Sequence, residues 1–161
     1  MRIAFLLAFV ACIPPGRARA IMPHVRLTGE VAPLVLDGAR AWLPLGFTFS
    51  TDDVGLPTCR RDWHRASGVR GCQIVIFVVR DPALIERRGT DALSNRDAST
   101  VTIDSRVTDR DKLRTAAAHE VGHIILDTAE HTVGGIMGGA SRYMHAVDKA
   151  LACRSIGVCL K

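Results

Sequence analysis

The sequence predicts a single α+β domain preceded by an export segment. The chain has 161 residues, which is long enough for one hydrophobic core. Gln73 to Val79 is a continuous apolar run rich in β-branched residues, which favours a buried strand. A long amphipathic helical pattern extends from about Thr108 to Leu126. The expected order of elements is a first helix, several strands, this long helix, a turn and a last helix. This order is typical of an α+β domain.

The first twenty residues have the layout of a secretory signal peptide. Met1-Arg2 provides a positive start, and Ile3 to Cys12 is an apolar run too short to cross a bilayer. Pro14, Pro15 and Gly16 break this run, and Ala18-Arg19-Ala20 is a cleavage site with small residues.

We therefore expect residues 1–20 to be removed and the mature domain, residues 21–161, to begin at Ile21. Two alternatives stay open: a buried N-terminal element, and a lipoprotein signal in which Cys12 carries the lipid. No other segment is long and apolar enough for a membrane span, so the mature chain is expected to be soluble, in the periplasm or outside the cell.

The charge balance excludes an obvious nucleic-acid binder. The whole chain has 21 basic and 16 acidic residues. Three arginines fall in the signal segment, so the mature part has 18 basic and 16 acidic residues, a net charge of +2. The arginines are scattered, and we expect no nucleic-acid partner.

Four cysteines remain in the mature chain, which suits an exported domain with two disulfides. Three connectivities are possible. We predict Cys59–Cys72 and Cys153–Cys159 because each pair closes a short local loop. A four-cysteine zinc site is the rival interpretation, but the tight spacings of such sites are absent.

The elements before the long helix follow from local patterns. A helix is expected over Pro33–Leu43, with proline in its first turn and Pro44 as its stop. Phe47–Thr51 alternates like a strand, and Val101–Asp104 is expected to form another.

The apolar run Gln73–Val79 suits a central strand covered on both faces. Gly89–Ser99 is polar and is expected to be irregular.

Thr108 is the expected cap of the long helix, with Asp111 completing a capping box. Apolar side chains gather on one stripe, whereas His119 and His123 fall on another side. The helix can therefore pack on a sheet while two histidines face a cleft. A final helix is expected over Ser141–Ala152, after a glycine-rich turn.

The segment His119-Glu120-Val121-Gly122-His123 carries the main chemical prediction. Two neutral imidazoles four residues apart on one helix face can bind the same zinc ion. Glu120 can deprotonate a zinc-bound water and later pass the proton to the leaving amine. The alternative without any metal site is a pair of solvated histidines on a helix surface.

The stretch His119 to Met137, HEVGHIILDTAEHTVGGIM, resembles the active-site segment of the metzincins, the zinc endopeptidases that include matrixins and astacins. Their pattern is HExxHxxGxxH, followed by a turn that bears a methionine. The resemblance implies a zincin-like fold: a twisted sheet packed on the active-site helix, then a Met-turn-like loop and a C-terminal helix. It also implies that Glu120 is the general base and that Met137 is a structural floor under the metal.

Two positions depart from the metzincin pattern: the family glycine falls on Leu126, and the third histidine falls on Ala129. The chain is more similar to bacterial zinc metalloproteases with a segment of the form HExGHLLLGxxxHxxxGIM. There the third histidine has the spacing of His131 and the glycine falls on Asp127. Aspartate tolerates a left-handed conformation better than most residues.

His131 is the predicted third zinc ligand, because a catalytic zinc usually has three protein ligands and one open position. Asp127 continues the four-residue spacing, but three ligands on one straight helix would spread over roughly 12 Å. The chain must therefore turn, and Asp127 suits that turn. Glu130 is the competing ligand, and the spacing in the similar bacterial segments favours His131.

Other polar residues have weaker indications. Tyr143 lies six residues after Met137, where packing is a better expectation than an oxyanion-binding role. His145 and His64 are expected to be surface residues, although His64 could influence substrate preference. Asp104 and Asp109 lack the dense acidic loop of a calcium site.

Together these patterns predict a secreted zinc-dependent endopeptidase whose substrate, a peptide or protein, lies extended along a strand edge beside the helix. The alternative is an exported zinc-binding interaction module with little turnover, although a structural zinc site has no need of Glu120. A lipase-type hydrolase is excluded because no serine lies in a GxSxG motif.

Overall fold

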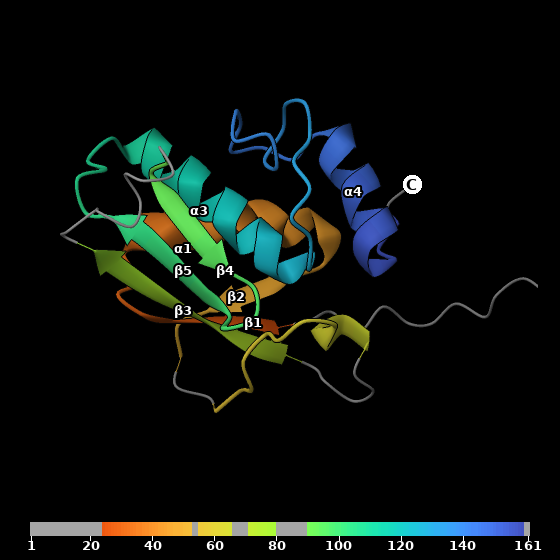
Figure 1. The fold of residues 1–161 in the computed structure, drawn as a ribbon, viewed down its shortest axis with the longest axis horizontal. Coiled ribbons are helices and arrows are strands. Elements are labelled where there is room, and N and C mark those ends of the chain that lie inside the picture. Colours follow the sequence, from red (N-terminus) through yellow and green to blue (C-terminus); the bar gives the residue numbers. More distant parts are fainter. Residues whose placement is uncertain (1–23, 53–54, 66–70, 80–89, 160–161) are drawn as a thin grey trace, which may run out of the picture.

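The computed structural model describes residues 24–52, 55–65, 71–79 and 90–159 (Figure 1). The expected signal segment, with Cys12 and the cleavage site before Ile21, lies outside these residues. The described part is an α+β domain with a five-stranded mixed sheet and three α-helices.

The sheet has the strand order β2-β1-β3-β5-β4. Its first four strands run parallel, and β4 pairs antiparallel with β5 at one edge. The strands are β1 (His24–Gly29), β2 (Thr48–Ser50), β3 (Gly71–Val79), β4 (Ala92–Asn95) and β5 (Thr100–Asp104). Parallel neighbours require crossover connections, and the helices provide cover for the sheet.

The predicted central strand is confirmed as β3, the middle strand of the five. The expectation that both its faces are covered is wrong. Ile74 and Ile76 are fully buried, but Phe77, on the other face, is 46% exposed. The cause is visible in Figure 1, where α1 and α3 lie together on one side of the sheet.

Two strands were not predicted. β1 lies between β2 and β3, and β4 occupies part of the segment that was expected to be irregular. Both are short or mixed in composition, so their pairing with neighbours defines them more than their own pattern does. The predicted strands near Phe47 and Val101 are present as β2 and β5.

The first helix is shorter in α geometry than predicted. It comprises α1 (Pro33–Ala39), followed by a 3-10 helix, η1 (Arg40–Leu45). Pro44 therefore does not stop the helix but lies within the 3-10 segment. The segment ends at Gly46, whose φ of 88° is left-handed and suits glycine.

The long helix is α3 (Arg110–Ile125), close to its predicted bounds. Thr108 is not its cap. Asp109 is the N-cap, and its Oδ1 accepts hydrogen bonds from the backbone N–H groups of Asp111 and Lys112, both at 2.9 Å. An aspartate can accept two such bonds, which explains why the cap lies one residue later.

Close packing joins α3 to α1 and η1. Gly38 of α1 approaches α3 so closely that an added Cβ would lie 3.0 Å from the Cβ of Ala117. The indole Nε1 of Trp42, fully buried in η1, donates to the backbone oxygen of Ala118 at 2.8 Å. The contact fixes the buried side of α3 and leaves its histidine side toward β4.

The last helix, α4 (Ala146–Ile156), begins five residues later than the predicted Ser141. Residues 141–145 are irregular. The helix begins where Asp148 can accept the backbone N–H of the N-cap residue His145, at 2.8 Å. This interaction is one half of a capping box, which the composition of 141–152 does not reveal.

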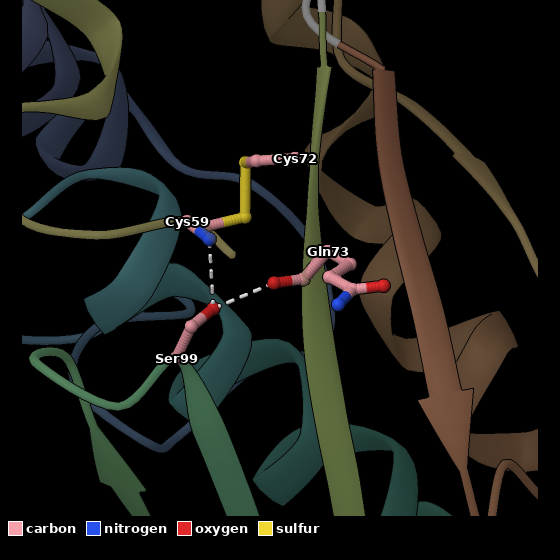
Figure 2. The surroundings of a disulfide bond; sticks show 4 residues. All are labelled: Cys59, Cys72, Gln73 and Ser99. Atoms are coloured by element: carbon pink, nitrogen blue, oxygen red, sulfur yellow. Dashed lines mark hydrogen bonds between the residues drawn. A yellow bond between two sulfur atoms is a disulfide. The ribbon is translucent and has the colours of Figure 1, made fainter. Parts of the chain in front are cut away.

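Both predicted disulfides are present, Cys59–Cys72 and Cys153–Cys159. The first is buried beside β3 (Figure 2). There the Oγ of Ser99 donates to the backbone oxygen of Gln73 at 2.7 Å and accepts the N–H of Cys59 at 3.2 Å. This hydroxyl links Cys59 to β3 and to the turn before β5. Disulfides of this kind fit an oxidising, exported environment.

Within the described ranges, no helix has the length and apolar composition needed to cross a membrane.

Candidate metal centre

Three histidines converge at the C-terminal half of α3. His119 and His123 come from successive turns of the helix, and His131 comes from the segment that follows. One ring nitrogen from each lies within 4.8 Å of the others. The rings of His119 and His131 stack with centroids 5.1 Å apart. A cluster of three imidazoles can hold a metal ion.

Backbone carbonyls orient two of the rings. The Nδ1 of His119 is 2.9 Å from the oxygen of Ile136, and the Nδ1 of His123 is 2.8 Å from the oxygen of Thr128. A carbonyl oxygen can only accept, so each Nδ1 carries the proton. In the neutral rings each Nε2 then has a free lone pair, which is the tautomer that ligates metals.

The two Nε2 atoms face each other at 3.1 Å. Two lone pairs at this distance repel unless a cation lies between them. Ligand nitrogens of a tetrahedral zinc site, each about 2.05 Å from the metal, are about 3.3 Å apart. The donor set therefore fits zinc, although it does not identify the metal.

A turn directly after α3 brings His131 to the other two. Asp127 has a φ of +47°, the left-handed conformation that was expected there. The backbone N–H of Thr128 donates to the oxygen of His123 at 3.1 Å, which closes the turn. The His131 side chain is exposed, and its ring makes no hydrogen bond with another described residue. It has room to approach a metal held by the other two.

The competing ligands lie elsewhere. The Oε2 of Glu130 accepts from Nη2 of Arg154 on α4 at 3.2 Å. The carboxylate of Asp127 accepts the backbone N–H of Asp62 at 2.8 Å and pairs with Arg96 at 3.6 Å. Neither belongs to the three-histidine cluster.

Glu120 is 8% exposed and projects from α3 toward the edge strand β4. Burial raises the pKa of its carboxyl group, and hydrogen bonding to Ser94 of β4 opposes this rise. A carboxylate with a raised pKa is better suited to accept and return a proton near neutral pH.

Burial also acts on His123. It lowers the pKa of His123 to about 4, while the hydrogen bond to the backbone oxygen of Thr128 opposes this change and nearby Arg96 adds to it. His123 is therefore neutral at neutral pH, as a metal ligand must be.

The methionine loop, residues 132–140, lies against the helix beneath the histidines. Met137 is fully buried. An added Cβ on Gly122 would lie 2.6 Å from the Sδ of Met137 and 2.5 Å from Cζ2 of Trp42. Glycine at this position is therefore what lets the loop and η1 pack against α3.

The histidines and Glu120 line a cleft of about 1090 Å³ between α3, β4 and the methionine loop. The edge strand β4 contributes one wall, with Ala92, Leu93 and Ser94. The opposite wall includes Gly138, Gly139 and Ala140, which are small. The volume of the cleft lies at the upper end of the range of about 300–1,000 Å³ that is usual for ligand pockets.

Several sequence candidates lie away from this cleft. Tyr143 is 65% exposed and borders a second groove with Leu43 and Pro44. His145 is exposed at the start of α4, and His64 lies in the disulfide loop. Asp104 pairs with Arg106, and Asp109 caps α3, so neither is available for a calcium site.

Three residues around the site were not predicted: Ser94, Arg96 and Asp148. Ser94 and Arg96 lie on or directly after β4, a strand that the sequence pattern did not indicate. Asp148 is the third residue of α4, and its role depends on hydrogen bonds to Ile136 and Met137 that the sequence does not show.

No protein-family model matches the chain, and no curated protein is significantly similar to it. The chemistry must therefore be argued from the site itself.

Proposed function

We propose that this protein is a secreted zinc-dependent endopeptidase, with His119, His123 and His131 as the metal ligands and Glu120 as the general base. The observation that carries the proposal is the pairing of a three-histidine cluster with a buried glutamate in one open cleft. A zinc site that serves only stability is usually closed by four protein ligands.

The arrangement of elements supports a zincin-like, metzincin-like fold. A mixed sheet with one antiparallel edge strand packs on the helix that carries two histidines. A tight loop with a buried methionine and a C-terminal helix follow, in the order that the resemblance of the segment His119–Met137 implies.

The zinc ion would supply a Lewis acid that makes a water molecule more acidic and polarises the substrate carbonyl. Glu120 accepts a proton from the attacking water on its carboxylate. It then returns that proton to the nitrogen of the leaving amine as the peptide bond breaks. Ser94 holds the carboxylate of Glu120 at the cleft wall through this cycle.

The substrate would bind as an extended strand along β4. Among the described residues this strand pairs only with β5, so its other side can offer backbone N–H and C=O groups to a peptide. The same strand carries Ser94 toward Glu120, so a scissile bond bound along β4 would lie beside the base.

Removal of the carboxylate tests the chemical assignment. We expect Glu120→Gln to lower peptidase activity by about 10²-fold to 10⁴-fold, because an amide cannot accept the proton. Zinc content should stay near that of the wild type, because Glu120 is not a ligand. Digestion of a peptide library, with zinc measured by atomic emission, reads out both properties.

Glu30→Gln is the matched control, since Glu30 is exposed between β1 and α1, away from the cleft. It should cleave peptides like the wild type. A wild-type protein that binds zinc tightly but cleaves no peptide would favour the alternative, an exported zinc-binding interaction module. Glu120→Gln activity near the wild-type rate would refute the assigned mechanism.

A further inference from the structure

A buried carboxylate on α4 lies outside the metal site and is used by no step above. Asp148 has no exposed surface. Its Oδ2 accepts the backbone N–H of Ile136 at 3.0 Å and that of His145 at 2.8 Å. Its Oδ1 accepts the N–H of Met137 at 3.0 Å. One side chain thus satisfies three backbone donors from two segments.

The methionine loop is shaped around this carboxylate. Gly135 has a φ of +71°, and a Cβ added there would collide with the Oδ2 of Asp148. Two further hydrogen bonds close the loop, from Thr132 N to Met137 O at 3.3 Å and from Gly139 N to Ile136 O at 2.9 Å. The carboxylate occupies the place that a side chain at residue 135 would take.

The same loop orients one metal ligand. The N–H of Ile136 donates a hydrogen bond to Asp148, and the carbonyl oxygen of Ile136 accepts one from the Nδ1 of His119. A displacement of this residue would move the acceptor that fixes the tautomer and orientation of the His119 ring. His123 is held differently, by the oxygen of Thr128, which has no bond to Asp148.

We propose that Asp148 is a positioning residue for metal binding: through the methionine loop it holds His119, rather than its helix neighbour His123, in its ligand orientation. The inference rests on the proposed metal site but not on peptide cleavage. On this proposal, α4 contributes to the geometry of the candidate metal centre through Asp148.

Asp148→Asn tests the proposal with little change of shape. The asparagine keeps one acceptor oxygen and turns an NH₂ group toward backbone donors, so at least one of the three hydrogen bonds is lost. Zinc affinity, measured by competition with a chelator, should fall about tenfold. The visible absorption of the Co²⁺-substituted protein should change, because the ligand geometry changes.

Asp104→Asn is the matched control. Asp104 is also a buried aspartate, bound by the N–H of Arg106 at 2.9 Å, and it does not line the cleft. It should lower stability without altering zinc affinity or the Co²⁺ spectrum.

Two measurements on metal-free protein separate this inference from the proposed function. The imidazole ¹⁵N shifts of His119 should move in Asp148→Asn while those of His123 stay. In the wild type, the amides of Ile136 and Met137 should exchange far more slowly than that of Val133, which is 99% exposed.

Equal His119 shifts in Asp148→Asn and Asp104→Asn, or fast exchange at Ile136 and Met137, would overturn the role of Asp148. The exchange measurement needs no variant and decides the matter even if Asp148→Asn does not fold. Failure of the wild type to bind zinc would instead overturn the proposed metal site.

Discussion

At the residue scale, the site depends on which nitrogen of each imidazole carries its proton. The Nδ1–H groups of His119 and His123 each donate a hydrogen bond to a backbone oxygen. The lone pairs of both Nε2 atoms therefore face each other. A pair of surface histidines would have no such fixed acceptors. The carbonyls of Ile136 and Thr128 are therefore as much a part of the candidate centre as the rings.

The third ligand can be tested by substitution of neighbouring residues. We expect His131→Ala to lose most of its zinc affinity, because two histidines alone leave the ion with too few protein ligands. Glu130→Ala should bind zinc nearly as the wild type does, since Glu130 pairs with Arg154. Side-by-side titration with a chromophoric chelator compares them, and the reverse ranking would assign the ligand to Glu130.

His119, Glu120 and His123 could be predicted because their spacing along one helix is local, and the left-handed Asp127 followed from the glycine position of the similar bacterial segments. The prediction of His131 as the third ligand needed the resemblance to a known segment, because residue spacing does not determine the path of the chain after the helix. Ser94 could not be predicted, because its role depends on β4, and a four-residue strand has too little pattern to identify.

At the element scale, α3 packs against two parts of the fold at once. Its buried side packs on α1 and η1, and its C-terminal half also receives the methionine loop. The helix carries a glycine, Gly122, at the crossing of these contacts, although glycine is a poor helix former.

We expect Gly122→Ala to destabilise the fold by about 1 kcal/mol or more, because overpacking against Trp42 and Met137 exceeds the gain in helix propensity. Thermal unfolding measures the change. Gly55→Ala is the control, since a Cβ there meets no atom within 4 Å. A variant at Gly122 as stable as the wild type would show that the contacts relax at little cost.

The turn after α3 allows a second test. Asp127 adopts a left-handed φ of +47° and accepts the N–H of Asp62. Asp127→Gly and Asp127→Ala both lose the acceptor, but only alanine is disfavoured in this conformation. We expect the glycine variant to be more stable by about 1 kcal/mol in urea unfolding. Equal stabilities would mean that the turn changes its conformation in the alanine variant.

The element boundaries show where sequence patterns are sufficient. The apolar stripe located α3 within two residues at each end, and the β-branched run located β3. The start of α4 was placed too early because it is set by the hydrogen bond from the N–H of His145 to Asp148, which the composition of 141–152 does not reveal. The cap of α3 moved by one residue, since Thr108 and Asp109 are both good caps and only geometry selects between them.

At the scale of the whole molecule, the two disulfides join different parts of the fold. Cys59–Cys72 is buried and ties the 55–65 segment to β3, whereas Cys153–Cys159 lies at the exposed end of α4. The cysteine spacing was enough to predict both pairs.

Loss of the first disulfide should cost more than loss of the second. By the chain-entropy relation, a disulfide stabilises the folded state by about 3 kcal/mol for a 13-residue loop and by about 2 kcal/mol for a 6-residue loop. We therefore expect Cys59→Ala/Cys72→Ala to unfold at lower urea concentration than Cys153→Ala/Cys159→Ala. Mild reductant should open the exposed bond first, and mass spectrometry of trapped thiols detects the order. Preferential opening of Cys59–Cys72 would contradict this account.

The position of β1 between β2 and β3 has a consequence for how the chain reaches its fold. His24 pairs with both Thr48 and Gly71, so the sheet is built from contacts between distant parts of the sequence. Such contacts are slow to form. The three clustered histidines, in contrast, lie within one short stretch that follows these strands in the chain. The rate of folding is thus governed by assembly of the parallel strands, and a metal bound by the completed cluster acts mainly by slowing the reverse reaction.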